Sequence, residues 1–294
     1  MTRLNSLRSY LTKPSRKRVS VTSFKNTPPR SAKERVGSAY AKCFGSARYR
    51  RMNDLLLYLA LRGLGFENWR NHNISGEEAF LRMLLDDIQC PIILDVGAYQ
   101  GEYAKLVRWY SPSATIYCFE PHPISFETLQ RAALDAELIP LRLACGAESG
   151  TCDLFDHASN DGSKRASFFA ETLCVRRVAP LTTHQIEVVT IDEFASTHGI
   201  DIVELLKVDV EGAELAVLQG ARELIKDGRI RAIQFELSYV NAVRRKWMRD
   251  FYDLLNGYSF YRLVPNGLVP LGKYDPATHE LFRYQNLVAL LGAR

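Results

Sequence analysis

Four carboxylates stand at the ends of short apolar runs, where they could bind hydroxyl groups or accept protons. Asp95 ends IILD, Glu120 ends TIYCFE, and Asp209 and Glu211 follow LLKV. Open α/β sheets bind ligands outside the carboxyl ends of their strands, which would bring these acids together. Taken alone, each acid also suits a solvated helix start, because acids in the first turn stabilise the positive end of the helix dipole.

From residue 91 onward, short apolar strands alternate with amphipathic helices. This pattern predicts a mostly parallel sheet with helices on both faces. Residues 146–199 suggest strands or loops inserted beside the sheet, and the late segments SFYRLVP and QNLVALL suit an antiparallel edge. The strands are expected at residues 92–97, 115–120, 138–145, 205–210 and 230–237, and the helices at residues 101–110, 123–134, 212–228 and 243–258.

The N-terminal part differs from the rest in charge and composition. Residues 1–33 contain nine Lys and Arg and no Asp or Glu, whereas residues 34–294 contain 29 and 33. We expect a disordered basic tail at 1–38 that is solvated or contacts an anionic surface, although its Arg and Ser content also resembles a mitochondrial transit peptide. A helical lead-in or cap is expected at 39–88, with LLLYLAL (55–61) as a core-helix segment, and the main domain at 89–294.

The composition disfavours several other classes. No apolar run approaches the roughly 18 residues of a membrane span. The six cysteines show no C-x-x-C spacing, so they read as reduced packing residues of a cytoplasmic protein, with no metal site predicted. The net acidity of residues 34–294 disfavours a nucleic-acid partner.

The first strand and turn suit a nucleotide-like ligand. Gly97 and Gly101 bracket the turn, which lets the backbone approach a ligand and exposes helix N–H groups. The dinucleotide fingerprint would need glycine where Tyr99 stands, which disfavours a nicotinamide oxidoreductase. Glu120 lies 25 residues after Asp95, where a carboxylate would bind ribose hydroxyls.

Four segments together resemble the FkbM family of S-adenosylmethionine-dependent methyltransferases. They are ILDVGAYQGEYAKLV, YCFEPHPISFETL, VTIDEFA and LLKVDVEGAELAVLQGA, and the similarity covers roughly residues 90–240. The resemblance implies a class I methyltransferase fold, a Rossmann-like, doubly wound, mostly parallel sheet with an antiparallel edge strand. It also implies S-adenosylmethionine as the cofactor and a hydroxyl acceptor on a sugar, glycolipid or natural product.

The resemblance also implies roles for individual residues. Asp95, Gly97 and Gly101 would hold the methionine end of the cofactor and Glu120 its ribose, while Cys145 would lie near adenine. Tyr99 would belong to the same cofactor loop, although the family usually has Asn at this position. Asp209 and Glu211 would line the reaction centre.

A hydroxyl acceptor needs a base that takes its proton during transfer. The sequence offers Asp209, Glu211, Glu236 and His122, and neighbouring carboxylates favour the first two because they raise one another's pKa. His122 suits surface or cofactor-loop packing better than catalysis. The alternatives are a non-catalytic protein with a methyltransferase fold, or a nucleic-acid methyltransferase.

Overall fold

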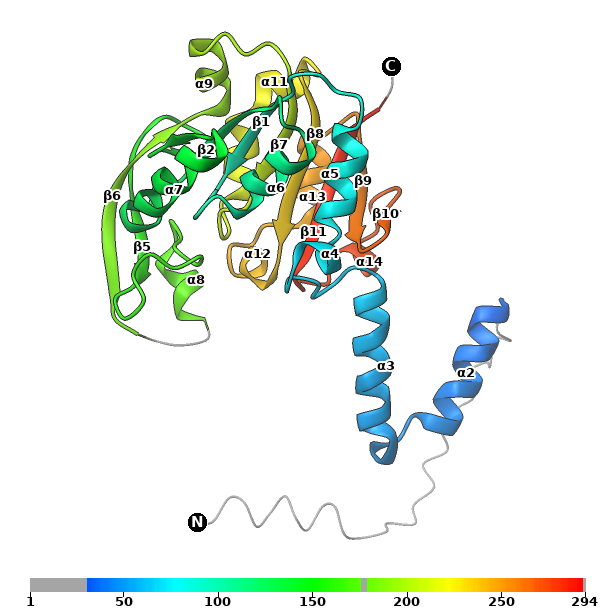
Figure 1. Ribbon diagram of the computed structural model, residues 1–294. Helices are drawn as coiled ribbons and strands as arrows, with labels where there is room; N and C mark the ends of the chain where they lie inside the picture. The colour runs from blue at the N-terminus through cyan, green and yellow to red at the C-terminus, as the bar shows by residue number, and fades with distance from the viewer. Residues whose placement is uncertain (1–30, 176–178, 293–294) are drawn as a thin grey trace, which may run out of the picture. The chain divides into compact units, whose positions relative to one another are not determined.

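A computed structural model describes residues 31–175 and 179–292 of the chain (Figure 1). The chain forms two compact units, Met1–Leu55 and Leu56–Arg294. The described part of the first unit contains α2 (Ala32–Phe44), the 3-10 helix η1 (Ala47–Tyr49) and the start of α3 (Arg50–Gly63).

Helix α2 begins within the segment predicted as a tail. The Ser31 hydroxyl accepts the backbone N–H of Glu34, and the Glu34 carboxylate accepts that of Ser31. This capping box satisfies two of the free N–H groups at the helix start. The remainder of the predicted tail, residues 1–30, lies outside the described residues.

The second unit is built on one eight-stranded sheet in the order β10-β9-β11-β8-β7-β1-β2-β3. Strands β8, β7, β1, β2 and β3 run parallel, whereas β11 is antiparallel to β8 and β9, and β10 forms an antiparallel edge on β9. This confirms the predicted sheet. The strands are β1 (Ile92–Val96), β2 (Thr115–Phe119), β3 (Ile139–Leu141), β7 (Val203–Val208), β8 (Ile230–Leu237), β9 (Tyr258–Val264), β10 (Gly267–Pro270) and β11 (Gln285–Leu291).

Helices cover both faces of this sheet, because central parallel strands are apolar on both sides. On β1, Ile93 packs into an apolar layer with α5, α6 and α7, while Leu94 packs into the opposite layer with α9, α10, α11 and α13. The helices are α4 (His72–Ser75), α5 (Glu77–Leu85), α6 (Glu102–Tyr110), α7 (Pro123–Ala136), α8 (Ala170–Cys174), α9 (Ile191–Thr197), α10 (Glu214–Gln219), α11 (Arg222–Lys226), α12 (Tyr239–Val243), α13 (Met248–Leu254) and α14 (Pro276–His279).

The insertion expected at residues 146–199 contributes most of a second sheet. Strand β6 (Leu181–Val189) pairs in parallel with β4 (Ala144–Cys145) and antiparallel with β5 (Gly150–His157). The prediction of one strand over 138–145 is therefore wrong, because the chain leaves the main sheet after β3 and joins the second sheet at β4.

Three helix predictions also need correction. The helix expected over 212–228 divides into α10 and α11 at Gly220, where a Cβ atom would lie 2.0 Å from the carbonyl oxygen of Gly146. The helix expected over 243–258 is confined to α13, and α12 precedes it. The supposed core segment LLLYLAL is exposed on α3 except at Leu61. Among the described residues, no helix is both long and apolar enough to cross a bilayer.

Candidate active site

The site lies where the chain order of the sheet reverses, between the carboxyl ends of β1 and β7. Gly97 follows β1 with a φ of 83°, and a Cβ atom there would lie 1.9 Å from the carbonyl oxygen of Asp209. The backbone N–H of Asp209 in turn donates to Val96 at 3.0 Å. Only glycine permits this approach, which joins the two strand ends at the position where doubly wound sheets bind ligands.

Asp95 is fully buried on β1, opposite Lys207 of β7. Neither carboxylate oxygen of Asp95 has a hydrogen-bond partner in the described part of the chain, and Lys207 Nζ lies 3.9 Å from Oδ1. Burial raises the pKa of Asp95 to about 6, although the Lys207 charge opposes the shift. A buried carboxylate in this condition is a ready partner for a donor supplied by a ligand.

Glu120 ends β2 and accepts two backbone N–H groups. Tyr99 donates to Oε2 and His122 donates to Oε1, both at 2.8 Å. Burial raises the pKa of Glu120 to about 7, against the effect of these two hydrogen bonds. Each oxygen keeps further accepting capacity, so the fixed carboxylate can receive two neighbouring hydroxyl groups.

The turn after β7 holds Glu211 in an unusual conformation. Glu211 has a φ of 50° and Gly212 a φ of 105°. Ser167 donates its hydroxyl to the Glu211 carbonyl at 2.9 Å, and Glu214 accepts the Gly212 N–H at 2.9 Å. Left-handed backbone at a residue with a large side chain persists only where its surroundings fix it, and such positions cluster at functional sites.

Three carboxylates meet beside this turn with different electrostatic surroundings. Asp209 accepts a hydrogen bond from Lys207 Nζ at 3.2 Å. Burial, reinforced by Asp209 and Glu214, raises the pKa of Glu211 to about 8. Burial also raises the pKa of Glu236, at the end of β8, well above its ordinary value, with the charges of Asp209 and Glu211 adding to the effect.

Lys207 is itself 6% exposed and lies 5.0 Å from the centre of the Tyr103 ring. Burial opposes its charge, but Asp209, Asp95 and Glu77 raise its pKa above the ordinary value. Two further hydrogen bonds extend the network. Tyr103 donates to Gln234 of β8 at 2.6 Å, and Gln234 donates to Glu77 of α5 at 3.1 Å. Lys207 is therefore a fixed, permanently charged cation between two carboxylates.

A cleft beside these residues lies between the main sheet and the insertion. It is lined by residues after β1, β2 and β7, by β4, and by the segment that follows β5. Its lining includes Gly97, Tyr99, Glu120, Leu143, Ala144, Cys145, Leu154, Ser163, Lys164, Ala166, Phe168, Asp209, Val210 and Glu211.

The family model of the methyltransferase FkbM domain matches residues 95–260, which is more than half of the chain. The chain belongs to the FkbM methyltransferase family. This confirms the resemblance seen in the sequence and the methyltransferase activity, with S-adenosylmethionine as the methyl donor.

Three relatives of this FkbM-family chain have names that state an activity. The 2-O-methyltransferase NoeI of Sinorhizobium fredii is 25% identical over 60% of this chain and 76% of its own. The hexuronic acid methyltransferase AglP of Haloferax volcanii is 31% identical over 52% and 60%. The 31-O-demethyl-FK506 methyltransferase FkbM of Streptomyces tacrolimicus is 25% identical over 58% and 72%.

Among solved structures, an O-methyltransferase from Bacillus cereus in complex with SAH covers 87% of this chain and 97% of its own, at 12% identity and a TM-score of 0.36. The fold class of this FkbM-family protein therefore rests on the strand order of its own sheet.

The residues of the cleft fit S-adenosylmethionine. The unpartnered carboxylate of Asp95 suits the cofactor's ammonium group, and the twice-anchored carboxylate of Glu120 suits its ribose hydroxyls. Gly97 lines the same cleft. Both carboxylates are therefore groups that the protein leaves ready for a ligand.

The structure brings together most of the predicted site residues of this FkbM-family protein. Gly97, Tyr99, Glu120 and Cys145 line the cleft, and Asp95 is buried next to Gly97. Gly101 is different, because a Cβ atom there would meet Leu129 at 3.0 Å. Its glycine thus serves the packing of α6 against α7.

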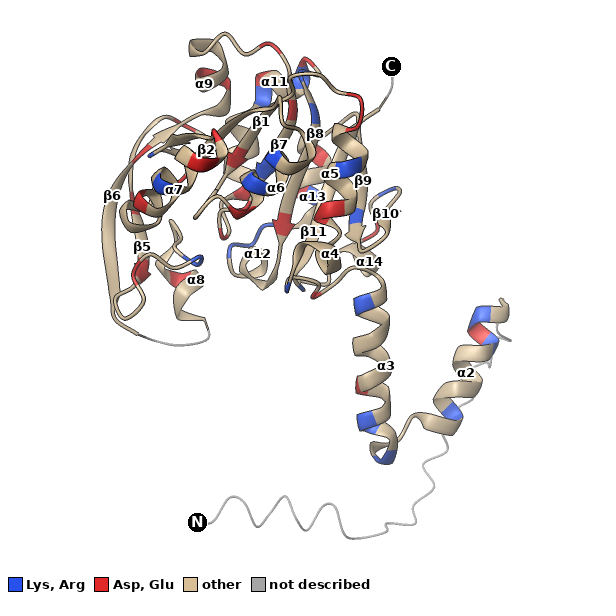
Figure 2. Cartoon of the chain, in the orientation of Figure 1, with Lys and Arg blue, Asp and Glu red and all other residues tan. Residues whose placement is uncertain are grey.

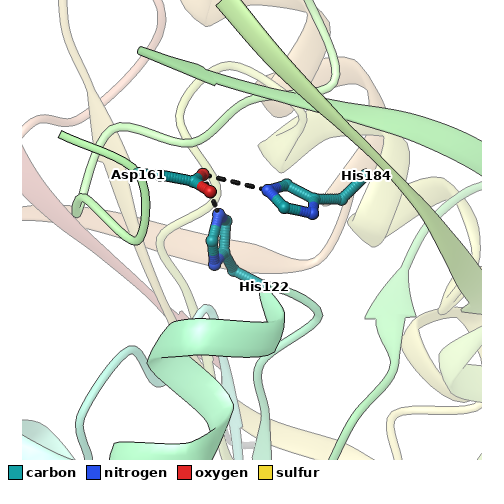
Figure 3. Close-up of side chains that lie close together, drawn as sticks. All are labelled: His122, Asp161 and His184. Atoms are coloured by element: carbon teal, nitrogen blue, oxygen red, sulfur yellow. Dashed lines mark hydrogen bonds and ion pairs between the residues drawn. The ribbon is translucent and has the colours of Figure 1, made fainter. Parts of the chain in front are cut away.

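His122 is 1% exposed and caps α7, so the packing interpretation fits and the surface interpretation does not. Its Nδ1 accepts the Ile124 N–H at 3.2 Å, and its Nε2 lies 3.0 Å from Asp161 Oδ1, which His184 Nε2 also contacts at 2.9 Å (Figure 3). These three groups have the composition of a metal site. However, a neutral imidazole that accepts at Nδ1 carries its proton on Nε2, so that atom donates to Asp161 and has no lone pair for a metal ion.

Several contributors to the site escaped sequence reasoning. Lys207 stands out in the sequence as a charge inside an apolar run, but nothing in the sequence connects it to Tyr103. Lys164 and Phe168 reach the cleft from the insertion, whose loose pattern gave no strand register. No sequence signal placed His184 beside Asp161.

Proposed function

We propose that the protein transfers a methyl group to a hydroxyl oxygen of a sugar, glycolipid or natural product. The observation that carries this proposal is the meeting of Asp209, Glu211 and Glu236 at the carboxyl ends of β7 and β8, beside the cofactor cleft. Two of the relatives are named for O-methylation and a third for a hexuronic acid acceptor. The free thiols of all six cysteines support the cytoplasmic location that we include in the proposal.

S-adenosylmethionine supplies an activated methyl group, whose C–S bond breaks as the bond to the acceptor oxygen forms. In this proposal Glu211 accepts the proton that the hydroxyl loses. Among the described residues, no cation is hydrogen-bonded to Glu211 as Lys207 is to Asp209, and the raised pKa of Glu211 suits a base near neutral pH. Asp209, held by Lys207, would orient the acceptor, and Glu236 in its protonated form would donate a hydrogen bond.

The cofactor roles remain part of the same proposal. Asp95 would bind the ammonium group and Glu120 the ribose. The backbone at Gly97 and Tyr99 would lie along the methionine end, and Cys145 would form the wall beside adenine. These assignments follow the positions of the residues around the cleft.

The experiment is a transfer assay with methyl-labelled S-adenosylmethionine and a panel of monosaccharides, uronic acids, glycolipids and polyketides. Each labelled product is then treated with mild alkali, which removes methyl esters and leaves methyl ethers. We expect alkali-stable label that requires Glu211, with Glu211→Gln as the inactive control. Alkali-labile label would show carboxyl methylation and contradict the hydroxyl acceptor, and thermal stabilisation by NAD but not by S-adenosylmethionine would contradict the proposal as a whole.

A further inference from the structure

Helix α3 displays an apolar stripe to solvent. Met52, Leu55, Leu56 and Leu59 recur at the three- and four-residue spacing that places side chains on one helix face. Leu55 is 56% exposed, Leu56 47% and Leu59 54%. Leucines that are half exposed in a continuous stripe indicate a face that binds another surface.

The same helix also carries basic residues. Arg50 and Arg51 begin the helix and Arg62 lies in its last turn, and Asp54 is its one acid. Basic residues outnumber acidic ones along α2 and α3 (Figure 2). Residues 1–63 as a whole contain fifteen Lys and Arg against two Asp and Glu, whereas residues 64–294 contain 23 against 31. The positive charge of the chain is thus concentrated in the sequence around this stripe.

The carboxyl half of α3 belongs to the second unit, where its end is packed. Leu61 is 8% exposed, and the Phe66 N–H donates to the Leu61 carbonyl at 2.9 Å. Phe66 is buried and bridges to Gln285 at the start of β11, and Arg262 lies over its ring at 3.9 Å. Trp69, 59% exposed, follows this anchor. Leu56 and Leu59 of the stripe therefore belong to the same unit as the methyltransferase domain.

We propose that the leucine stripe of α3 docks this protein on the surface of a bilayer that contains anionic phospholipids. An apolar helix face with basic residues around it is the combination that inserts at the boundary between headgroups and acyl chains. The Lys and Arg of residues 1–63 match the negative surface potential, and an exposed tryptophan suits the interface. The partner is the lipid surface itself, and the helix lies along it without crossing.

The experiment is flotation of the full-length protein with vesicles of phosphatidylcholine alone or of phosphatidylcholine with 30% phosphatidylglycerol, a composition that gives the negative surface potential on which this mode of binding depends. The variant is Leu56→Gln with Leu59→Gln, which leaves the charge unchanged. The matched control is Trp109→Gln with Leu134→Gln, since both side chains are highly exposed on α6 and α7. We expect binding to the anionic vesicles only, at least tenfold weaker in the α3 variant and within twofold of wild type in the control.

Three results would overturn the proposal. The first is equal flotation with neutral and anionic vesicles, and the second is unchanged flotation of the α3 variant. The third is a dimer in light scattering that only the α3 variant disrupts, because a second copy of the protein would then occupy the stripe. S-adenosylmethionine affinity is measured by calorimetry on the same preparations. Loss of that affinity with normal flotation would count against the proposed function alone.

Discussion

The ammonium nitrogen of Lys207 lies 3.2 Å from the Oδ2 atom of Asp209, below the cleft of the FkbM domain. The same nitrogen is 3.9 Å from Asp95 Oδ1, so one buried cation serves both the carboxylate that we propose to orient the acceptor and the one proposed to bind the cofactor. The Lys-x-Asp spacing on β7 follows from strand geometry, since residues two apart point to the same face. Lys207 thus connects the two halves of the site.

We predict that Lys207→Met lowers the free energy of unfolding by about 3 kcal/mol, because removing one partner leaves buried charges uncompensated. The variant should also bind S-adenosylmethionine more weakly, since the pKa of Asp95 would rise further without the cation. Chemical denaturation and calorimetry provide the two measurements. The double variant Lys207→Met with Asp95→Asn should recover part of the lost stability, and an additive loss would contradict the coupling.

A second prediction concerns the proton acceptor. Because a carboxylate must be ionised to take a proton, and the pKa of Glu211 is raised to about 8, kcat/KM should increase as the pH rises through about 8 and then level off. Glu211→Gln should lower kcat by roughly 10²- to 10⁴-fold and abolish this dependence, while S-adenosylmethionine affinity changes little.

Glu236 provides the matched comparison for that experiment. Burial raises its pKa well above the ordinary value, which favours the protonated form, and the amide of Glu236→Gln reproduces a neutral hydrogen-bond donor. We therefore expect this variant to retain activity within about tenfold, as for a group that donates a hydrogen bond without transferring a proton. A profile in which Glu236→Gln, and not Glu211→Gln, removes the rise with pH would reverse the two assignments.

The sheet and the site followed from the sequence to different extents. Strands β1, β2, β7 and β8 could be predicted because buried parallel strands are short apolar runs. The acids at the ends of these runs placed the predicted site at the carboxyl ends of the strands. The run over 138–145 gave no sign of its division between two sheets, since both halves are apolar. The spacing of apolar residues indicates which positions are buried, but it does not indicate which strand pairs with which.

The misread helices have a related cause. Nothing in the sequence marks a break at Gly220, yet the carbonyl of Gly146, distant in sequence, leaves no room for a side chain there. LLLYLAL has the composition of a core helix, but composition cannot show whether another element covers it. Lys207 could be recognised as unusual within an apolar strand. Its partners Tyr103, Asp95 and Glu77 could not, because they come from α6, β1 and α5.

A third prediction concerns the close approach at Gly97. Gly97→Ala should lower the free energy of unfolding by more than about 3 kcal/mol, because its Cβ would overlap the Asp209 carbonyl oxygen in a backbone conformation that already disfavours alanine. Gly37→Ala is the control, since nothing lies within 4 Å of that Cβ in α2. Thermal denaturation should therefore separate the variants, and equal melting temperatures would contradict the reported approach.

The last prediction addresses Tyr99, which stands where the FkbM family usually has Asn. Its φ of 50° lies in the left-handed region, which Asn tolerates and β-branched residues resist. Tyr99→Asn and Tyr99→Val both lose the contact of the ring with Lys164, so the difference between them isolates the backbone term. We expect the Asn variant to be more stable than the Val variant by at least about 1 kcal/mol in chemical denaturation.

The same pair of variants tests how Tyr99 acts on the cofactor cleft. The contact with Glu120 is made by the Tyr99 backbone N–H at 2.8 Å, which a side-chain change does not remove. Tyr99→Asn should therefore keep S-adenosylmethionine affinity within about threefold, whereas Tyr99→Val should weaken it, because strain in the turn displaces the donor. If the Asn variant instead loses affinity by tenfold or more, the Tyr99 ring contacts the cofactor directly and the backbone explanation is wrong.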